Sequence, residues 1–144
     1  MSEDVKLIFP TISPRLKSEE GEKFIWDSLR GKWLVLTPEE WVRQHTIGWL
    51  VTHQGIPALR ITQEYPVKIN GLNQRADIVV MNEFAKPHIL VECKAPEIEI
   101  DNEVVMQAMR YNTIVQAQYI LLTNGKKLYC FEYANGKYRA VKEF

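Results

Sequence analysis

Residues 88–94 read HILVECK, and this short stretch places two charges at the end of a buried strand. Residues 88–91 have the apolar character of a strand inside a sheet. Glu92 and Lys94 follow in the same run, and because strand side chains alternate between faces, both point to the same side. Burying a carboxylate and an ammonium group there is costly unless something compensates them. The stretch therefore predicts a core strand that carries a functional site at its end.

A second misplaced acid lies on the preceding strand. Residues 75–81 form a largely apolar run that contains Asp77. The connection at residues 82–87 allows this run to pair with the strand that carries Glu92, which would bring the two carboxyls close together. Two close carboxylates repel each other and raise a pKa unless a cation lies between them.

Magnesium would compensate this pair. It prefers oxygen ligands and takes one or two carboxylates, which leaves positions for water and a substrate phosphate. Asp77, Glu92 and the backbone carbonyl of Cys93 would supply that partial shell, and Mn²⁺ can substitute. Lys94 would orient or deprotonate a water, or stabilise the charge that develops on a phosphorane. The favoured chemistry is metal-assisted hydrolysis of a phosphodiester. A solvated cross-strand ion pair is the alternative for Glu92 and Lys94 taken alone.

The elements around this site predict an α/β domain with a mixed sheet. Thr37 precedes Pro38 and stands three residues before Glu40, which is the capping-box pattern of a helix start. A second helix between the third and fourth strands permits a parallel pair, and a β-hairpin closes the domain. The expected elements are a helix from residue 37 to about residue 54, strands at 59–69, 75–81 and 88–94, a helix at 102–115 capped by Asp101, and strands at 119–123, 127–133 and 137–142.

Composition indicates one globular domain. The chain has 144 residues, of which 46% are hydrophobic, and it contains no apolar run long enough for a membrane span and no signal-peptide pattern. We expect a cytoplasmic protein with an N-terminal arm at residues 1–23 and a single domain at residues 24–144. Residues 24–26 and 33–36 are expected to be short strands or a helical turn. Cys93 and Cys130 lack the spacing of a zinc site or a disulfide framework and are expected to be buried.

Charge restricts where a polyanion can bind. Eighteen Lys and Arg residues balance eighteen Asp and Glu residues, so a nucleic-acid surface must be a local patch. On the second expected helix, Gln107 and Tyr111 are four residues apart and share a stripe with Glu103. This stripe is expected to face the metal and a bound phosphate. An exposed polar face with Tyr111 half-buried is the alternative.

These residues together resemble the PD-(D/E)xK nuclease superfamily. Asp77 matches its lone acid, Glu92-Cys93-Lys94 matches (D/E)xK, and Gln107 with Tyr111 matches the QxxxY helix of RecB-like branches. More narrowly, residues 36–44, 75–79, 91–96 and 110–112 resemble the N-terminal nuclease domain of type I restriction enzyme R subunits. The likeness covers roughly residues 24 to 133.

The resemblance implies a restriction-endonuclease-like αβββαβ core that binds Mg²⁺ and cuts DNA. In many relatives a first-helix Glu joins the metal shell, and Glu40 is the candidate here. Ala76 stands where the nominal motif has Pro. The chain has no GxxxxGK[ST] loop, so we expect no translocation by the P-loop mechanism from this chain. The expected partners are DNA and either a second copy of the chain, because cutting both strands calls for two active sites, or other restriction-type subunits.

Three functional hypotheses follow. The first is a metal-dependent DNA endonuclease, in which Asp77 and Glu92 hold Mg²⁺ and Lys94 assists attack by water, while Gln107 and Tyr111 position that water or the phosphate. The second is a nucleic-acid-binding module that keeps the fold without cutting. The third is an interaction domain whose charges form a buried ion-pair network. In the first, the expected phosphate-neutralising residues are Arg75, Lys86 and Arg110.

Overall fold

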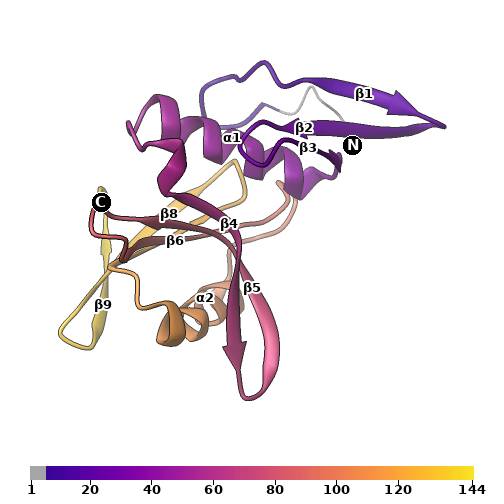
Figure 1. Ribbon diagram of the computed structural model, residues 1–144. Helices are drawn as coiled ribbons and strands as arrows, with labels where there is room; N and C mark the ends of the chain where they lie inside the picture. The colour runs from indigo at the N-terminus through magenta and orange to yellow at the C-terminus, as the bar shows by residue number, and fades with distance from the viewer. Residues whose placement is uncertain (1–5) are drawn as a thin grey trace.

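The computed structural model describes residues 6–144, which form two β-sheets and two α-helices. The smaller sheet is antiparallel, with strand order β1-β2-β3, and the larger sheet has strand order β4-β5-β6-β7-β8-β9. In Figure 1 the small sheet and α1 lie on one side of the large sheet, and α2 lies on the other. No helix in the described part of the chain is long and apolar enough to cross a membrane.

The large sheet is mixed, as expected. All its neighbours are antiparallel except β6 and β7, which pair in parallel from Ile89–Tyr119 to Cys93–Thr123. The α2 crossover between these two strands makes the parallel pairing possible. The helices are α1 (Pro38–Thr52) and α2 (Asn102–Val115), and the strands are β4 (Ile61–Ile69), β5 (Leu72–Met81), β6 (Pro87–Cys93), β7 (Tyr119–Thr123), β8 (Leu128–Ala134) and β9 (Lys137–Val141). The order α1-β4-β5-β6-α2-β7 is the predicted αβββαβ core.

Each helix is held by the cap that its sequence predicts. The Thr37 side chain accepts a hydrogen bond from the Glu40 N–H, and Asp101 accepts one from Val104. The end of α2 is set by Gln116, which adopts the left-handed conformation. Caps of this kind satisfy backbone groups that a helix end leaves unpaired.

Two hydrophobic clusters cover the two faces of the large sheet. The first joins α1, through Trp41, Val42 and Leu50, to Ile78 and other strand residues. The second joins α2, through Ala108, Tyr111 and Val115, to Val79, Leu90 and Leu122. Because both faces are buried, the central strands are apolar along nearly their whole length. Charged residues on these strands therefore stand out.

The N-terminal region differs from the expected arm. Residues 1–5 of that arm lie outside the described residues. Its second half belongs to β1 (Leu16–Glu19) and to the start of β2 (Glu22–Asp27), so the boundary at residue 24 falls inside a strand. With β3 (Lys32–Val35), these strands form a folded sheet that packs on the core through Ile25 and Leu34. Pairing between short polar strands supplied this structure, and local pattern does not reveal such pairing.

Candidate active site

The candidate site lies where β5 and β6 separate. Their ladder ends at the pair Ile78–Val91, and the next residues in register are Asp77 and Glu92. At this position, side-chain carboxyl oxygens accept the backbone hydrogen bonds that carbonyl oxygens accept elsewhere in the ladder. The Asp77 N–H donates to Glu92 Oε1 at 3.2 Å, and the Cys93 N–H donates to Asp77 Oδ2 at 2.8 Å. The two carboxyls are thus held against each other by the backbone of the opposite strand.

Burial raises the pKa of both carboxyls, Asp77 and Glu92. Burial is the main cause for Glu92, the charge of Asp77 adds to it, and together they raise the pKa of Glu92 to about 9. The pKa of Asp77 is also raised by burial, although the Cys93 N–H, Arg43 and Lys94 oppose this rise. A hydrogen bond between the two side chains lowers the pKa of Asp77 and raises that of Glu92. Without a cation, these effects favour a proton on Glu92 over one on Asp77.

Lys94 stands beside three acids. Its charge lowers the pKa of Asp77, of Glu92 and of Glu39, which places the ammonium group within electrostatic range of all three. The Lys94 backbone is fixed by its N–H, which donates to Thr123 O at 2.9 Å and continues the parallel register of β6 and β7. The side chain is partly buried. The structure thus brings Asp77, Glu92 and Lys94 together.

The first turn of α1 contributes Glu39 to this cluster. Partial burial raises the pKa of Glu39, and the charge of Asp77 raises it further. Glu40, the first-helix candidate predicted from the sequence, points its carboxylate elsewhere. It accepts hydrogen bonds from Arg43, at 3.1 Å and 2.5 Å, and from Gln44 Nε2 at 2.9 Å. Glu40 therefore orients Arg43, whose charge lowers the pKa of Asp77.

The strand on the other side of Asp77 is also interrupted. The pairing of β4 with β5 passes from Gln63–Ile78 to Tyr65–Ala76 and omits the position of Glu64 and Asp77. Glu64 has a positive φ of 53°, which costs roughly 1–2 kcal/mol in a residue with a Cβ. An ion pair of 2.8 Å with Arg30, in the turn between β2 and β3, holds its carboxylate. Asp77 thus lies in a gap between two strands.

The donor set fits a hard divalent cation. Backbone N–H groups use one oxygen of each carboxyl, and this leaves Asp77 Oδ1 and Glu92 Oε2 for a proton or a cation. Within residues 6–144, no three His, Cys, Asp or Glu side chains converge closely enough to hold an ion by themselves. A cation here would bind through Asp77, Glu92 and the Cys93 carbonyl, with water in the remaining positions. Magnesium accepts such a shell, because it retains several waters.

The α2 pair reaches β5 without touching the two carboxyls. Gln107 Nε2 donates to the Tyr111 hydroxyl at 3.0 Å, and this hydroxyl donates to Gln74 Oε1 at 3.1 Å. Gln74 lies three residues before Asp77 on β5. Among the described residues, no hydrogen bond joins Gln107 or Tyr111 to Asp77 or Glu92. The metal-facing or phosphate-facing role of the α2 pair stays a prediction.

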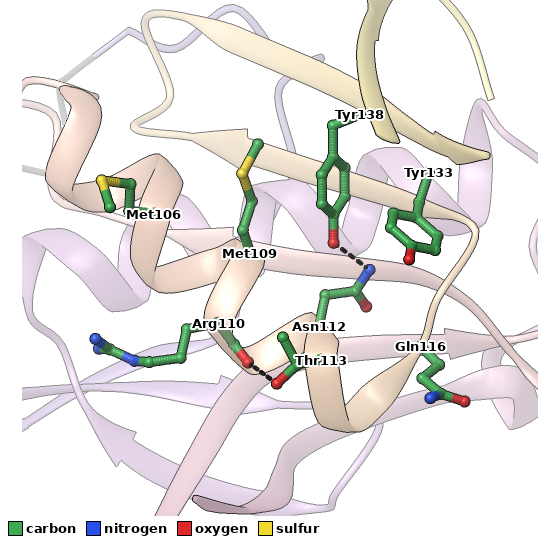
Figure 2. Close-up of a pocket in the computed structure, with 8 residues that line it drawn as sticks. All are labelled: Met106, Met109, Arg110, Asn112, Thr113, Gln116, Tyr133 and Tyr138. Atoms are coloured by element: carbon green, nitrogen blue, oxygen red, sulfur yellow. Dashed lines mark hydrogen bonds between the residues drawn. The ribbon is translucent and has the colours of Figure 1, made fainter. Parts of the chain in front are cut away.

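The three expected phosphate-binding residues lie in different places. Arg75 is exposed, and its charge lowers the pKa of Glu64 beside the site. Lys86 precedes β6, six residues before Glu92 and about 20 Å away along an extended chain. Arg110 lines a cavity of about 790 Å³ between α2 and the β8–β9 hairpin, and Figure 2 shows it pointing away from Tyr133 and Tyr138. The structure places only Arg75 near the site.

Sequence reasoning missed Glu39, Arg43 and Glu64. Glu39 and Glu40 are neighbours in the first turn of α1, and choosing between them requires the rotation of the helix about its axis. Arg43 stands three residues after Glu40, so a helical ion pair was visible in the sequence. Glu64 has no local signal, because its importance comes from its register opposite Asp77.

This arrangement defines a restriction-endonuclease-like α/β fold with two acids and a lysine at the point where its central strands separate. Among solved structures, the type IIG restriction endonuclease BpuSI is similar to this chain with a TM-score of 0.50 and 21% sequence identity. The match covers 67% of this chain and 11% of that protein, so this chain spans a small part of the longer enzyme. A DUF820 protein from Anabaena variabilis, described as a candidate nuclease, gives a TM-score of 0.47 and 14% identity over 93% of this chain and 80% of its own.

A family model identifies the family. The model described as type I restriction enzyme R protein N terminus (HSDR_N) matches residues 38–144, which is most of the chain. The chain belongs to this family, as the resemblance of its motifs predicts. No curated protein sequence gives a significant match. The match begins at the first residue of α1 and leaves the β1–β3 sheet outside.

Proposed function

We propose that this domain is a metal-dependent deoxyribonuclease that hydrolyses phosphodiester bonds. The observation that carries the proposal is the pair Asp77–Glu92, half-buried and held by crossed backbone hydrogen bonds, with Lys94 beside it. Membership of the R protein N-terminal family and the fold of a restriction endonuclease support a nuclease-type function. The family's description also supports DNA as the substrate.

The reaction would add water to phosphorus and break one P–O bond, giving a phosphate monoester and a hydroxyl group. Mg²⁺, when bound, supplies Lewis-acid activation and charge neutralisation. Asp77 and Glu92 would hold it through the oxygens that the backbone leaves free. Lys94 would stabilise the negative charge that grows on the phosphate oxygens, since its ammonium group already lies beside the carboxyl pair. Arg43, fixed by Glu40, would add positive charge at the same edge.

The experiment compares cleavage of supercoiled and linear DNA in Mg²⁺, in Mn²⁺ and in EDTA. We expect metal-dependent nicking or cutting that is lost in Asp77→Asn, Glu92→Gln and Lys94→Met, with circular dichroism unchanged. Glu83→Gln is the matched control, because Glu83 is an exposed acid in the connection between β5 and β6, at the end of these strands away from the carboxyl pair. DNA binding without cleavage in either metal would instead identify a binding module that keeps the nuclease fold.

Partners follow from the same proposal. The family's description places this kind of domain at the N terminus of a restriction R protein, so other restriction-type subunits are the expected protein partners. A homodimer would give two active sites for cutting both strands of a duplex. Sedimentation of the protein alone and with a DNA duplex distinguishes one copy per duplex from two.

A further inference from the structure

The small sheet displays a row of aromatic rings and cations on one face. Trp26 pairs with Trp33, and Lys17 pairs with Phe24, so each pair shares a face of the sheet. Phe24 and Trp26 are two residues apart on β2 and therefore point the same way. The opposite face packs on the core through Ile25 and Leu34. We call the outward set the aromatic–cation face; its members are Arg15, Lys17, Phe24, Trp26 and Trp33.

The cations and rings of this face alternate. The Arg15 guanidinium carbon lies 5.0 Å from the ring centroid of Trp26 and 5.5 Å from that of Trp33. Lys17 Nζ lies 4.7 Å from the centroid of Trp33 and 5.5 Å from that of Phe24. The two Trp rings are themselves in contact, with centroids 5.2 Å apart. All three rings are partly exposed, whereas the opposite face of the same sheet packs on the apolar core.

Rings fix the two cations without neutralising them. Within residues 6–144, Arg15 makes no ion pair, and Lys17 makes one exposed ion pair of 2.9 Å, with Glu19. A cation held by a ring has lost part of its conformational freedom and keeps its charge, so it is prepared to bind an anion. Alternating rings and cations match a single nucleic-acid strand, whose bases stack on aromatic rings and whose phosphates pair with Arg and Lys.

The sheet that carries this face is attached beside the candidate site. The turn between β2 and β3 contacts β4 through the ion pair of Arg30 with Glu64, and Glu64 is the register neighbour of Asp77. Strand β3 leads within three residues to α1, whose first turn carries Glu39. In Figure 1 the β1–β2 hairpin projects beyond the rest of the molecule. The small sheet that carries the aromatic–cation face is therefore attached to β4, the strand next to the one that carries Asp77.

We propose that the aromatic–cation face binds a single strand of DNA, with bases on Trp26 and Trp33 and phosphates on Arg15 and Lys17. This inference rests on the proposed function, because it takes DNA as the polymer that the domain acts on. It adds a surface that lies before the residues matched by the family model and that determines the strandedness of the substrate.

The test measures binding of the whole chain to a labelled oligothymidine and to a duplex of equal length, in EDTA so that no cleavage occurs. We expect Trp33→Leu to weaken single-strand binding about fivefold or more and to reduce the quenching of tryptophan fluorescence. Trp33→Phe, which keeps a stacking ring, should recover most of the affinity. Arg15→Ala with Lys17→Ala should reduce the slope of log K against log salt by about 1.4, since two phosphate contacts are lost.

The charge-matched control is Lys137→Ala with Lys142→Ala, two exposed lysines outside the small sheet. It should leave the single-strand affinity and the tryptophan quenching unchanged. Thermal melting of each variant shows whether the sheet still folds, and the Trp33→Phe comparison separates stacking from folding.

Three results would overturn the inference. In the first, the native chain does not bind the single strand. In the second, the affinity and the salt slope are the same in the face variants as in the native chain. In the third, the variants weaken binding of the duplex alone, which would mean phosphate contacts without stacking. Cleavage in Mg²⁺ is measured separately. Single-strand binding through the face without any cleavage refutes the nuclease proposal alone. Cleavage with unaltered binding in the face variants refutes this inference alone.

Discussion

Replacing Glu92 with Gln is expected to stabilise the metal-free protein at alkaline pH. Burial and the charge of Asp77 raise the pKa of Glu92 in the folded chain to about 9, from 4.5 as the ordinary value. A glutamine side chain has nearly the shape of the protonated acid. It keeps an oxygen that accepts the Asp77 N–H, and its amide can donate to the Asp77 carboxylate. The substitution therefore removes a titration and preserves the contacts.

The direction of this change in stability with pH follows from the protons that the folded and unfolded chains bind. Between pH 4.5 and about 9, the folded chain keeps a proton on Glu92 that the unfolded chain releases, so the contribution to stability falls as pH rises. Each pH unit in this window costs at most about 1.4 kcal/mol. At pH 8 the accumulated cost has an upper limit of about 5 kcal/mol, and relaxation around the site reduces it to a few kcal/mol. The Glu92→Gln variant avoids this cost.

Urea unfolding at pH 5, 6, 7 and 8 in EDTA measures the difference between variant and native protein. We expect nearly equal free energies of unfolding at pH 5 and a variant more stable by roughly 2–5 kcal/mol at pH 8. Mg²⁺ should then stabilise the native chain at pH 8 and have little effect on the variant. Glu83→Gln serves as the control for loss of an exposed acid. A free-energy difference that does not change with pH would refute the reasoning.

Three other substitutions test separate parts of the molecule. Lys94→Met should reduce the rate of DNA cleavage by about 100-fold or more with little change in melting temperature, because it removes the cation beside the carboxyl pair; an unchanged rate contradicts its role. Asn112→Ala should lower the free energy of unfolding by about 2–3 kcal/mol, measured in urea, because the buried amide bonds both backbone groups of Ala117 and the Tyr138 hydroxyl. Gly125→Ala should lower the free energy of unfolding by about 1–2 kcal/mol in the same assay, since Gly125 has a φ of 83° and lies against the N-terminal segment. An unchanged free energy of unfolding would contradict this expectation.

The fold could be predicted where local signals agree with one another. Helix α2 has the bounds that were expected, because Asp101 caps its start and the chain leaves the helix at Gln116. Strand β7 also has its expected bounds, since a continuous apolar run between polar residues identifies a strand buried on both faces. The pairs Asn70-Gly71 and Asn135-Gly136 adopt positive φ at both residues, as tight hairpins require.

The strand pair of the candidate site could be predicted for a related reason. Asp77 and Glu92 are charges inside apolar runs, and the short connection between those runs leaves one natural register. The target of Tyr111 could not be predicted in this way. Its spacing from Gln107 fixes the helix face they share, but Gln74, to which the hydroxyl bonds, is chosen by the position of α2 on the sheet. Helix rotation and strand pairing over long distances are tertiary properties that one sequence window does not contain.

The two crossed hydrogen bonds at the end of β5 and β6 make two backbone amides sensitive to ion binding at the carboxyl pair. The amide protons of Asp77 and Cys93 are protected by carboxyl oxygens instead of carbonyls, so their protection depends on the state of those carboxyls. An ion that withdraws electron density from both acids weakens both acceptors at once. The exchange rates of two backbone amides, followed by NMR, can therefore report filling of the site in a protein that is not turning over.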